Sequence, residues 1–331
     1  MKVAELGEFG LIDLLAKMVT GSPSPRLILG IGDDAAAWQA ETATQLVTTD
    51  SLFQDVHFSL QTTSWEDLGW KSLAANLSDI AAMGGRPEYA LVSLGLPGHI
   101  EVNDVVALYR GMIDIGQRFG AVIIGGDTCR ASIVSITITV LGATGRDDRR
   151  LLTRSAARPG DGIAVTGSLG ASAGGLEMLA NQLHLDTDTA ADLKNAHLRP
   201  LPRVAEGQVL LRRGVRAAID ISDGLVADLH HVCRASRAGA RVEVEKIPVH
   251  PAVKAAFGDK ALDMALSGGE DYELLFTAPA EIIRQIKGEV SCPVTVIGEI
   301  RADPAVGVSL VDATGNPVEL TRTGWEHFTA K

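Results

Sequence analysis

Acidic residues placed at turns are the feature of this chain that could do chemistry. Six aspartates stand at glycine turns or at the ends of predicted strands and helices: Asp34, Asp50, Asp79, Asp127, Asp220 and Asp223. Carboxylates that lie close together repel one another and resist burial unless a cation compensates their charge. Mg²⁺ prefers oxygen ligands and usually works beside substrate phosphates. The aspartates therefore predict a site for several metal ions and a phosphate-bearing substrate.

Hydroxyl groups and glycines accompany the aspartates of the first half. Thr48 and Thr49 come directly before Asp50, at the end of a predicted strand, and offer oxygen atoms to a hard ion or to its waters. Gly126 and Asp127 follow another predicted apolar strand, where paired glycines let a phosphate approach the backbone. Each turn taken alone also fits an ordinary helix cap or loop.

The second half of the chain repeats this arrangement. Asp220 and Asp223 flank Ser222 after a predicted strand, and Ser267–Glu273 forms a third acidic turn. A capping role explains any one of these turns by itself. Their shared chemistry at the ends of strands favours a metal–phosphate site.

Two common nucleotide-binding patterns do not fit the chain. The turn around Gly30 and Gly32 resembles a dinucleotide-binding G-x-G-x-x-A turn, but Asp33 and Asp34 lie inside it and would repel a pyrophosphate without a metal. No lysine directly follows a glycine, so the chain lacks the Gly-Lys pair that a P-loop requires. A phosphoryl transfer would depend on metals for charge neutralisation, with Arg154 as the cation best placed to assist.

The composition excludes several classes of protein. The net charge of −11 over 331 residues argues against a nucleic-acid surface, which requires clustered Lys and Arg. The three cysteines form no C-x-x-C pair, which excludes a zinc knuckle and a disulfide framework and suits a reducing compartment. No apolar run approaches the ~20 residues that span a bilayer. We expect a cytoplasmic protein that binds neither nucleic acid nor membrane.

The predicted elements indicate two α+β domains, residues 1–148 and 149–331, joined through the charged stretch Arg146–Gly162. Strands lie next to one another with helices grouped between them, which favours α+β over a doubly wound parallel sheet. The first domain is predicted to hold helices from Ser64 to about Gly84 and over Glu101–Phe119. Its predicted strands are Leu27–Ile31, Gln45–Thr49, Ala90–Leu96, Ala121–Ile124 and Ile133–Ala143. Those of the second are Ile163–Thr166, Ala217–Ile221, Ala240–Val244, Tyr272–Thr277, Val294–Ile300 and Val308–Val311.

An ordered series of motifs resembles the thiamine-monophosphate kinase family. The motifs are GIGDDA, TTDS, NLSDIAAMG, GGDT, LTRSAARPGD, VTGSLG, HLRPLPR, AIDISDGL, SGGEDYEL and GWEHF. The resemblance runs from Glu8 to about Phe328. This family shares a superfamily with aminoimidazole ribonucleotide synthetase and selenophosphate synthetase. The resemblance implies a two-domain ATP-binding fold of the aminoimidazole ribonucleotide synthetase type, whose N-terminal domains pair in a homodimer. It also implies ATP-dependent phosphorylation of thiamine monophosphate to thiamine diphosphate, the last step of thiamine diphosphate biosynthesis, with several Mg²⁺ ions and ATP as co-substrate.

The resemblance assigns roles motif by motif. Metal ligands are implied at Asp34, Thr48, Thr49, Asp50, Asp79, Asp127, Asp220 and Asp223. ATP contacts are implied at Gly126, Asp127, Arg154 and Ser222, and contacts to thiamine monophosphate at His57, Glu270 and Trp325. No protein nucleophile is implied, because a phosphate oxygen of the substrate attacks the γ-phosphorus of ATP in line.

Other functions stay open at this point. Aminoimidazole ribonucleotide synthetase is the nearest alternative enzyme, and a non-catalytic sensor of Mg²⁺-nucleotide is an alternative of another class. An oxidoreductase would require binding of NAD(H). A selenophosphate synthetase is expected to have a cysteine or selenocysteine near its N-terminus, whereas the first cysteine here is Cys129.

Overall fold

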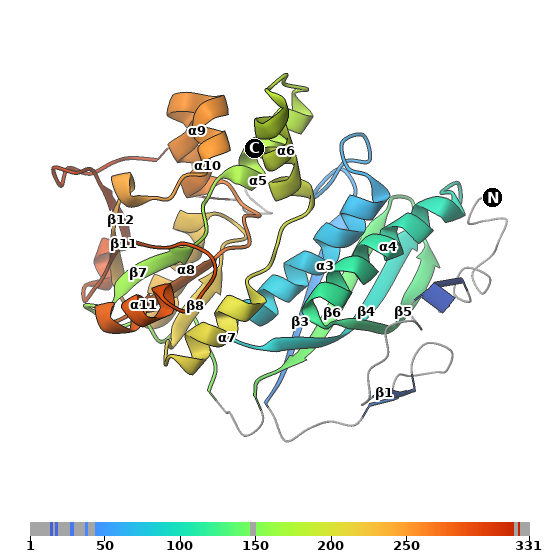
Figure 1. Cartoon of the computed structure of the whole chain (residues 1–331), viewed down its shortest axis with the longest axis horizontal. Helices are drawn as coiled ribbons and strands as arrows, with labels where there is room; N and C mark the ends of the chain where they lie inside the picture. Colours follow the sequence, from blue (N-terminus) through green and yellow to red (C-terminus); the bar gives the residue numbers. More distant parts are fainter. Residues whose placement is uncertain are drawn as a thin grey trace. The chain divides into compact units, whose positions relative to one another are not determined.

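The chain folds into two compact units. The computed structural model describes residues 44–145, 150–320 and 324, together with positions 14, 15, 17, 18, 27–29 and 37–38. The first unit comprises Met1–Ile80 and Gly85–Arg149, and the second comprises Ala81–Gly84 and Arg150–Lys331. Each unit has helices packed on a mixed sheet, which confirms the predicted two-domain α+β class (Figure 1).

A four-stranded sheet organises the first unit. Its strands lie in the order β3 (Gln45–Phe53), β6 (Ser135–Ala143), β4 (Arg86–Leu96) and β5 (Val122–Arg130). β4 and β5 are parallel, whereas β6 is antiparallel to both β3 and β4. Two short strands, β1 (Leu27–Leu29) and β2 (Ala37–Trp38), form a separate antiparallel pair.

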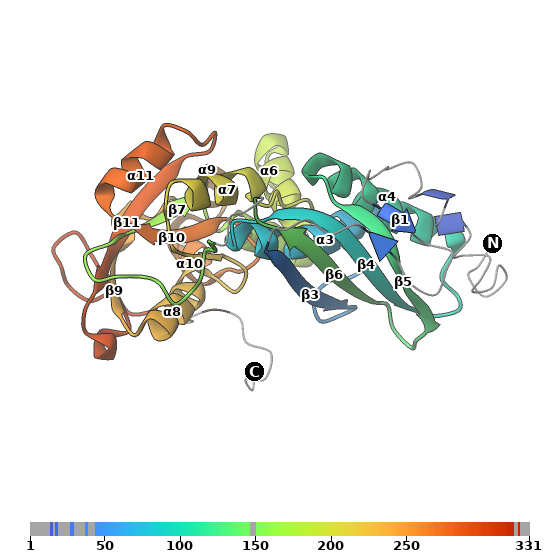
Figure 2. The ribbon, with the colours of Figure 1, turned by 90° about the horizontal axis from the view of Figure 1, so that it is seen from below.

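Two long helices cover one face of this sheet, α3 (Trp65–Ala82) and α4 (Val102–Phe119), as Figures 1 and 2 show. Leu73 and Leu77 of α3 are fully buried, and so is Ile138 of β6, so apolar packing holds the helices on the sheet. Ser64 caps the start of α3, because its hydroxyl accepts a hydrogen bond from the Asp67 N–H at 3.1 Å. Both predicted helices of this domain are confirmed.

A six-stranded sheet organises the second unit. Its strands lie in the order β12 (Val308–Val311), β9 (Gly239–Glu243), β11 (Val294–Arg301), β7 (Gly162–Thr166), β10 (Leu274–Ala278) and β8 (Ala217–Asp220). Only the pairing of β12 with β9 is parallel among these strands. The β10–β8 pair matters most for the site, because Leu274 lies opposite Asp220 in its register.

Helices cover both faces of this second sheet. On one face pack α5 (Ala171–Ala180), α6 (Thr187–Leu198), α8 (Leu225–Ser236), α9 (Pro251–Phe257) and α10 (Ala261–Ser267); on the other pack α7 (Val204–Arg212) and α11 (Ala280–Lys287). Side chains along β7 point alternately to the two helical layers: Ile163 and Val165 belong to one apolar cluster and Ala164 to the other. Single-turn 3₁₀ helices lie at Val244–Lys246, Gly258–Lys260 and Pro304–Val306.

Two predicted strand ends are wrong. TTDS lies inside β3, since β6 pairs with every residue from Gln45 to Phe53. GGDT lies inside β5, which continues beside β4 to Arg130. The predictions stopped where apolar residues stopped, but backbone pairing continues through polar residues wherever a neighbouring strand supplies the hydrogen bonds. The three short helices α9, α10 and α11 were also not predicted.

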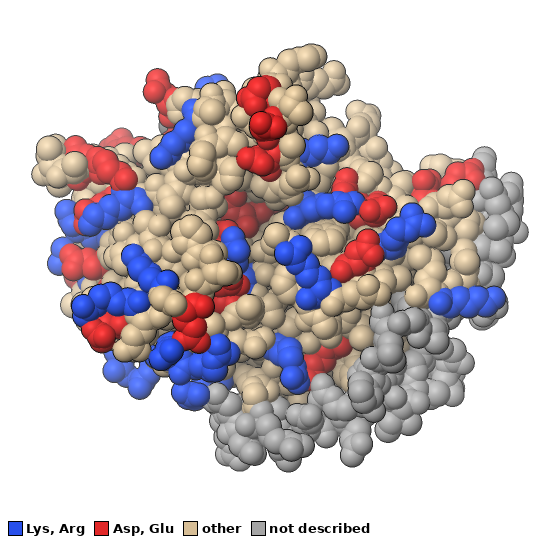
Figure 3. All heavy atoms as spheres, in the orientation of Figure 1, with Lys and Arg blue, Asp and Glu red and all other residues tan. Residues whose placement is uncertain are grey.

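The described surface carries both signs of charge. Figure 3 shows Lys and Arg interspersed with Asp and Glu over the visible face. The cysteines are all free thiols, with Cys129 exposed, Cys292 half-buried and Cys233 buried. Within the described ranges, none of the helices has the length and apolar character needed to cross a membrane.

Candidate active site

In the first unit, the structure brings together a strand hydroxyl and a helix carboxylate. Thr48 of β3 donates a hydrogen bond to Asp79 Oδ2 of α3 at 2.5 Å. Successive strand residues point to opposite faces, so Thr48 and Asp50 share the face that α3 covers. Three of the predicted metal ligands, Thr48, Asp50 and Asp79, therefore lie on the same side of the sheet.

A buried amide lies one helical turn before Asp79. Asn76 is fully buried, and its Nδ2 donates to the Ser72 carbonyl at 3.1 Å. Its Oδ1 has no hydrogen-bond partner among residues that the structure describes. Because a buried acceptor without a partner is costly, this oxygen would suit a donor or a cation bound at this turn of α3.

Thr49 and Asp127 occupy other positions on the sheet. The Thr49 hydroxyl donates to the Ile138 carbonyl at 3.1 Å, and it accepts from the Thr139 hydroxyl at the same distance. Asp127 is exposed and lies beside Ser93 of β4 in the register. Because side chains along a strand alternate between the two faces of the sheet, Thr49 and Asp127 lie on the face opposite Asp50.

Gly126 is required by the pairing of β4 with β5. A Cβ on this residue would lie 1.8 Å from the Val92 carbonyl oxygen, and its φ is +154°. Only glycine allows so close an approach of the two strands. The second glycine of GGDT therefore has a role in the sheet as well as its predicted role beside a phosphate.

A tight turn after β3 orients His57. The Phe53 N–H donates to His57 Nδ1 at 3.0 Å, and the His57 N–H donates back to the Phe53 carbonyl at 2.9 Å. An Nδ1 atom that accepts a hydrogen bond carries no proton, so the neutral ring carries its proton on Nε2. His57 thus has one ring nitrogen, Nδ1, committed to the turn.

In the second unit, the DISDG turn surrounds a buried carboxylate. Asp220 ends β8 and is 2% exposed. The three successive N–H groups of Ser222, Asp223 and Gly224 all donate to Asp228 Oδ2 at 3.1–3.2 Å. Asp228 lies in the first turn of α8, where a carboxylate is stabilised by the helix dipole. It sets the conformation in which Ser222 and Asp223 are presented.

Asp223, Asp228 and His231 form a cluster of metal-ligating groups in the described part of the chain. One potential ligand atom from each lies within 4.8 Å of the others. Burial, and then the charge of Asp223, raise the pKa of Asp228 to about 7, against the lowering effect of its three backbone hydrogen bonds. A cation beside Asp223 would relieve this repulsion, so the oxygen donors of Asp223 and Asp228 suit Mg²⁺.

The acidic turn of Ser267–Glu273 packs directly on the DISDG turn. The Glu270 N–H donates to the Ser222 carbonyl at 2.8 Å, and the Tyr272 N–H donates to the Ile221 carbonyl at 2.9 Å. These bonds place Glu270, a predicted substrate contact, next to Ser222, a predicted ATP contact. The two acidic turns of the second unit therefore lie side by side, joined by backbone hydrogen bonds.

Arg154 lies on an exposed loop that is tied to α8. The Ser236 hydroxyl donates to the Arg154 carbonyl at 2.8 Å and accepts from the Ala157 N–H at 3.0 Å. The backbone at Arg154 is therefore held on the second unit.

Two predicted site residues, Asp34 and Trp325, lie outside the described residues. So does most of Leu11–Val19, where the sequence predicts a short amphipathic helix, and its described positions 14, 15, 17 and 18 are helical. The sequence reasoning did not single out Asp228 or His231. Both follow DISDG on one helix at a spacing of three residues, and that spacing was the signal available.

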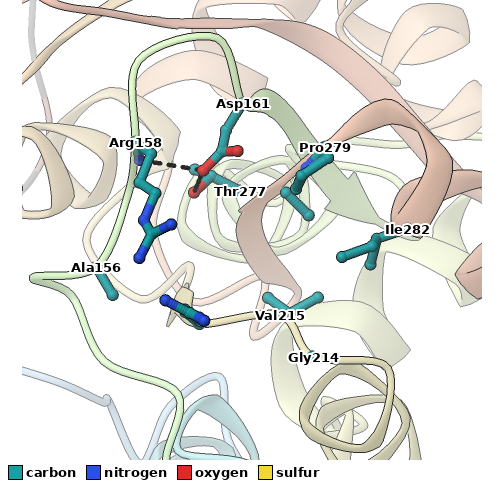
Figure 4. Close-up of a pocket in the computed structure, with 10 residues that line it drawn as sticks. Ala156, Arg158, Asp161, Gly214, Val215, Thr277, Pro279 and Ile282 are labelled. Carbon is teal, nitrogen blue, oxygen red and sulfur yellow. Dashed lines mark hydrogen bonds between the residues drawn. The ribbon is translucent and has the colours of Figure 1, made fainter.

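A pocket of about 170 Å³ lies away from the two acidic turns of the second unit (Figure 4). Its lining includes Arg216, which precedes β8, and Ala278, which ends β10, whereas the acidic turns lie at the other ends of those strands. Asp161 in this pocket accepts a hydrogen bond from the Arg158 N–H at 3.0 Å. The pocket is thus separate from the two acidic turns of the second unit.

Comparison with known proteins covers nearly the whole chain. Residues 32–144 match the AIR synthase related protein N-terminal domain, and residues 158–311 match the C-terminal domain. Thiamine-monophosphate kinase of Escherichia coli K12 is 40% identical, over 97% of this chain and 98% of that protein. The chain belongs to the thiamine-monophosphate kinase family. This confirms the resemblance expected from the motifs.

Solved structures of thiamine-monophosphate kinases share the fold. The crystal structure from Stenotrophomonas maltophilia K279a superposes with a TM-score of 0.81 at 37% identity, covering 91% of this chain and 95% of that one. AaThiL complexed with AMPPCP and TMP superposes with a TM-score of 0.78 at 34% identity, and the match covers 99% of both chains. This agreement confirms the predicted fold type.

Proposed function

We propose that this protein transfers the γ-phosphoryl group of ATP to thiamine monophosphate and so forms thiamine diphosphate and ADP, the last step of thiamine diphosphate biosynthesis. The observation that carries the proposal is the 40% identity to a thiamine-monophosphate kinase over 97% of the chain. A relative that is 34% identical over 99% of the chain binds AMPPCP and TMP together. These two compounds correspond to the two substrates of the proposed reaction.

The donor groups fit Mg²⁺. In the first unit, Thr48, Asp50 and Asp79 offer oxygen atoms on one side of the sheet, and Asn76 Oδ1 is a buried acceptor one helical turn before Asp79. In the second unit, we assign Asp220 and Asp223 as ligands; for Asp34, Thr49 and Asp127 the same role stays a prediction. When bound, Mg²⁺ would neutralise the phosphate oxygens between which the phosphoryl group passes.

The protein's own residues bind and orient the substrates. We assign Gly126, Asp127, Arg154 and Ser222 to ATP, and His57, Glu270 and Trp325 to thiamine monophosphate. The turn after β3 orients His57 through its Nδ1. Trp325 suits a ligand with a cationic thiazolium ring and a flat pyrimidine.

The reaction needs no protein nucleophile. A terminal phosphate oxygen of thiamine monophosphate forms the new bond to the γ-phosphorus of ATP, and the bond from that phosphorus to the β,γ-bridging oxygen breaks, so that ADP leaves. The attacking oxygen is already ionised, so no strong general base is required. Positioning and charge neutralisation then supply the catalysis.

We also propose that the protein is a homodimer formed through the first unit. Large apolar side chains are exposed in and next to the β3 and β6 strands of its sheet: Val47 (71%), Val56 (54%), Phe53 (41%) and Ile133 (40%). Exposed apolar side chains grouped on one sheet favour association with a partner. A second copy of the same sheet is the partner that the family resemblance implies.

We infer a cytoplasmic location from the cysteines. Cys129, Cys233 and Cys292 are all free thiols, as expected for a reducing compartment.

The test is to incubate the purified protein with Mg²⁺-ATP and thiamine monophosphate and to separate the thiamine phosphates by chromatography. Equal amounts of thiamine diphosphate and ADP, both lost with EDTA, are expected. The Asp50→Ala variant should be inactive while its circular dichroism spectrum is unchanged. ATP consumption only with the substrate of aminoimidazole ribonucleotide synthetase would favour that enzyme, and tight nucleotide binding without turnover would favour a sensor.

A further inference from the structure

The acidic turn that carries Glu270 has a strained backbone. Glu270 has a φ of +66° and Tyr272 a φ of +50°, in the left-handed region that side chains rarely adopt. Such a conformation persists only where surrounding contacts impose it, and it is typical of functional loops. The contacts that impose it here involve all three acidic residues of the segment: Glu270, Asp271 and Glu273.

Glu273, at the end of the turn, is held by Arg203. This carboxylate is 6% exposed and accepts hydrogen bonds from Arg203 Nε at 2.6 Å and from Arg203 Nη2 at 2.5 Å. The Thr166 hydroxyl at the end of β7 donates to the same carboxylate at 2.6 Å. Gly167 permits this packing, because a Cβ there would lie 1.9 Å from Glu273 Oε1. A two-point guanidinium–carboxylate contact fixes both the position and the orientation of the partner.

Asp271, in the middle of the turn, is held by the start of α5. Its carboxylate accepts from the Gly170 N–H at 2.7 Å and from the Ser172 N–H at 3.2 Å. The unpaired N–H groups of a helix start are strong donors to a carboxylate. This contact anchors the turn between its two glutamates.

Glu270, the predicted substrate contact, lies against His197. Its Oε2 is 3.6 Å from His197 Nδ1, and that nitrogen is 3.1 Å from the Ser172 hydroxyl. His197 is 6% exposed, so its ring is fixed by packing. Arg203, which holds Glu273, is six residues further along the same HLRPLPR motif. One segment of the chain therefore contacts the acidic turn at Glu270 and at Glu273.

We propose that HLRPLPR is a clamp that sets the position of Glu270 and so determines the affinity for thiamine monophosphate. His197 and Arg203 are positioning residues, which act through Glu270 and Glu273. This inference rests on the proposed function. It adds two residues to which the motif resemblance assigned no role.

The test compares Arg203→Lys with Arg284→Lys, a control on an exposed ion pair with Glu281. Lysine keeps the charge but cannot make the two-point contact. We expect the KM for thiamine monophosphate to rise at least about tenfold in Arg203→Lys, with the KM for ATP within about twofold of wild type. The control should leave both constants unchanged. Calorimetric binding of thiamine monophosphate without ATP should weaken by the same factor.

A second pair of variants keeps the test decisive if Arg203→Lys does not fold. His197→Leu removes the polar atom beside Glu270 and should raise the same KM. His197→Asn can place its amide nitrogen where Nδ1 lies, so its KM for thiamine monophosphate should return to the wild-type value. Unchanged KM for thiamine monophosphate in the folded variants, or a parallel rise in both KM values, would overturn the clamp. Failure of the proposed function is distinguishable, because the wild-type protein itself would then form no thiamine diphosphate.

Discussion

Replacing Asp271 by asparagine should change how the stability of the protein depends on pH. Burial raises the pKa of Asp271 from about 3.8 to about 7, although its hydrogen bonds from the Gly170 and Ser172 N–H groups favour the ionised form. The folded state thus binds this proton more tightly than the unfolded state does. Stability is therefore greatest below the unfolded pKa and falls as the pH rises towards 7.

The magnitude follows from the two pKa values. Between about pH 5 and pH 8 the folded carboxyl releases its proton, whereas the unfolded one is already ionised. At about 1.36 kcal/mol per pKa unit, the free energy of unfolding loses up to about 2.5 kcal/mol over this interval. Since the residue as a whole is only half-buried, solvent screening reduces the expected loss to about 1–2 kcal/mol.

The assay is urea unfolding followed by circular dichroism, with EDTA present, at several pH values. Asparagine does not titrate. Between pH 5 and pH 8, the free energy of unfolding of the wild type should therefore fall by about 1–2 kcal/mol relative to that of Asp271→Asn. All other titrating groups are common to both proteins and cancel in the difference. A difference that stays constant within about 0.3 kcal/mol would refute the reasoning, since Asp271 would then be ionised in the folded state throughout.

Three further perturbations test other parts of the site. Asp79→Asn should raise the Mg²⁺ concentration needed for half-maximal activity at least about tenfold without changing the unfolding curve, whereas the exposed control Asp188→Asn should behave as wild type in the same titration. Gly126→Ala should destabilise the first unit by more than about 2 kcal/mol in urea unfolding, because its Cβ would meet the Val92 carbonyl; an unchanged midpoint would contradict the register of β4 and β5. Val47→Glu should shift the protein from dimer to monomer in sedimentation velocity, and a dimer that persists would place the interface elsewhere.

The sequence predicted elements best where apolar residues are continuous. The strands at Ile163–Thr166 and Val308–Val311 and the helix over Glu101–Phe119 agree with the structure within a residue or two. TTDS and GGDT were placed at strand ends because their residues are polar. Whether a polar stretch stays in a strand depends on a neighbour, here β6 for TTDS and β4 for GGDT, and no local pattern contains that information.

The acidic turns were identified from residue types, but their supporting contacts were not. Asp228 reaches back to Ser222 over six residues, whereas Arg203 meets Glu273 across 70 residues of sequence. Tertiary packing alone creates the second contact. The motif that contains Arg203 was useful for recognising the family, and only the fold indicates what it does.

The most direct test of the proposed function is to follow the reaction by ³¹P NMR with unlabelled ATP, Mg²⁺ and thiamine monophosphate. The account predicts that the monophosphate signal of thiamine and the γ signal of ATP decrease together. The two coupled signals of a thiamine-bound diphosphate should increase at the same rate, without inorganic phosphate. Release of inorganic phosphate, with the thiamine monophosphate signal unchanged, would contradict the proposed transfer.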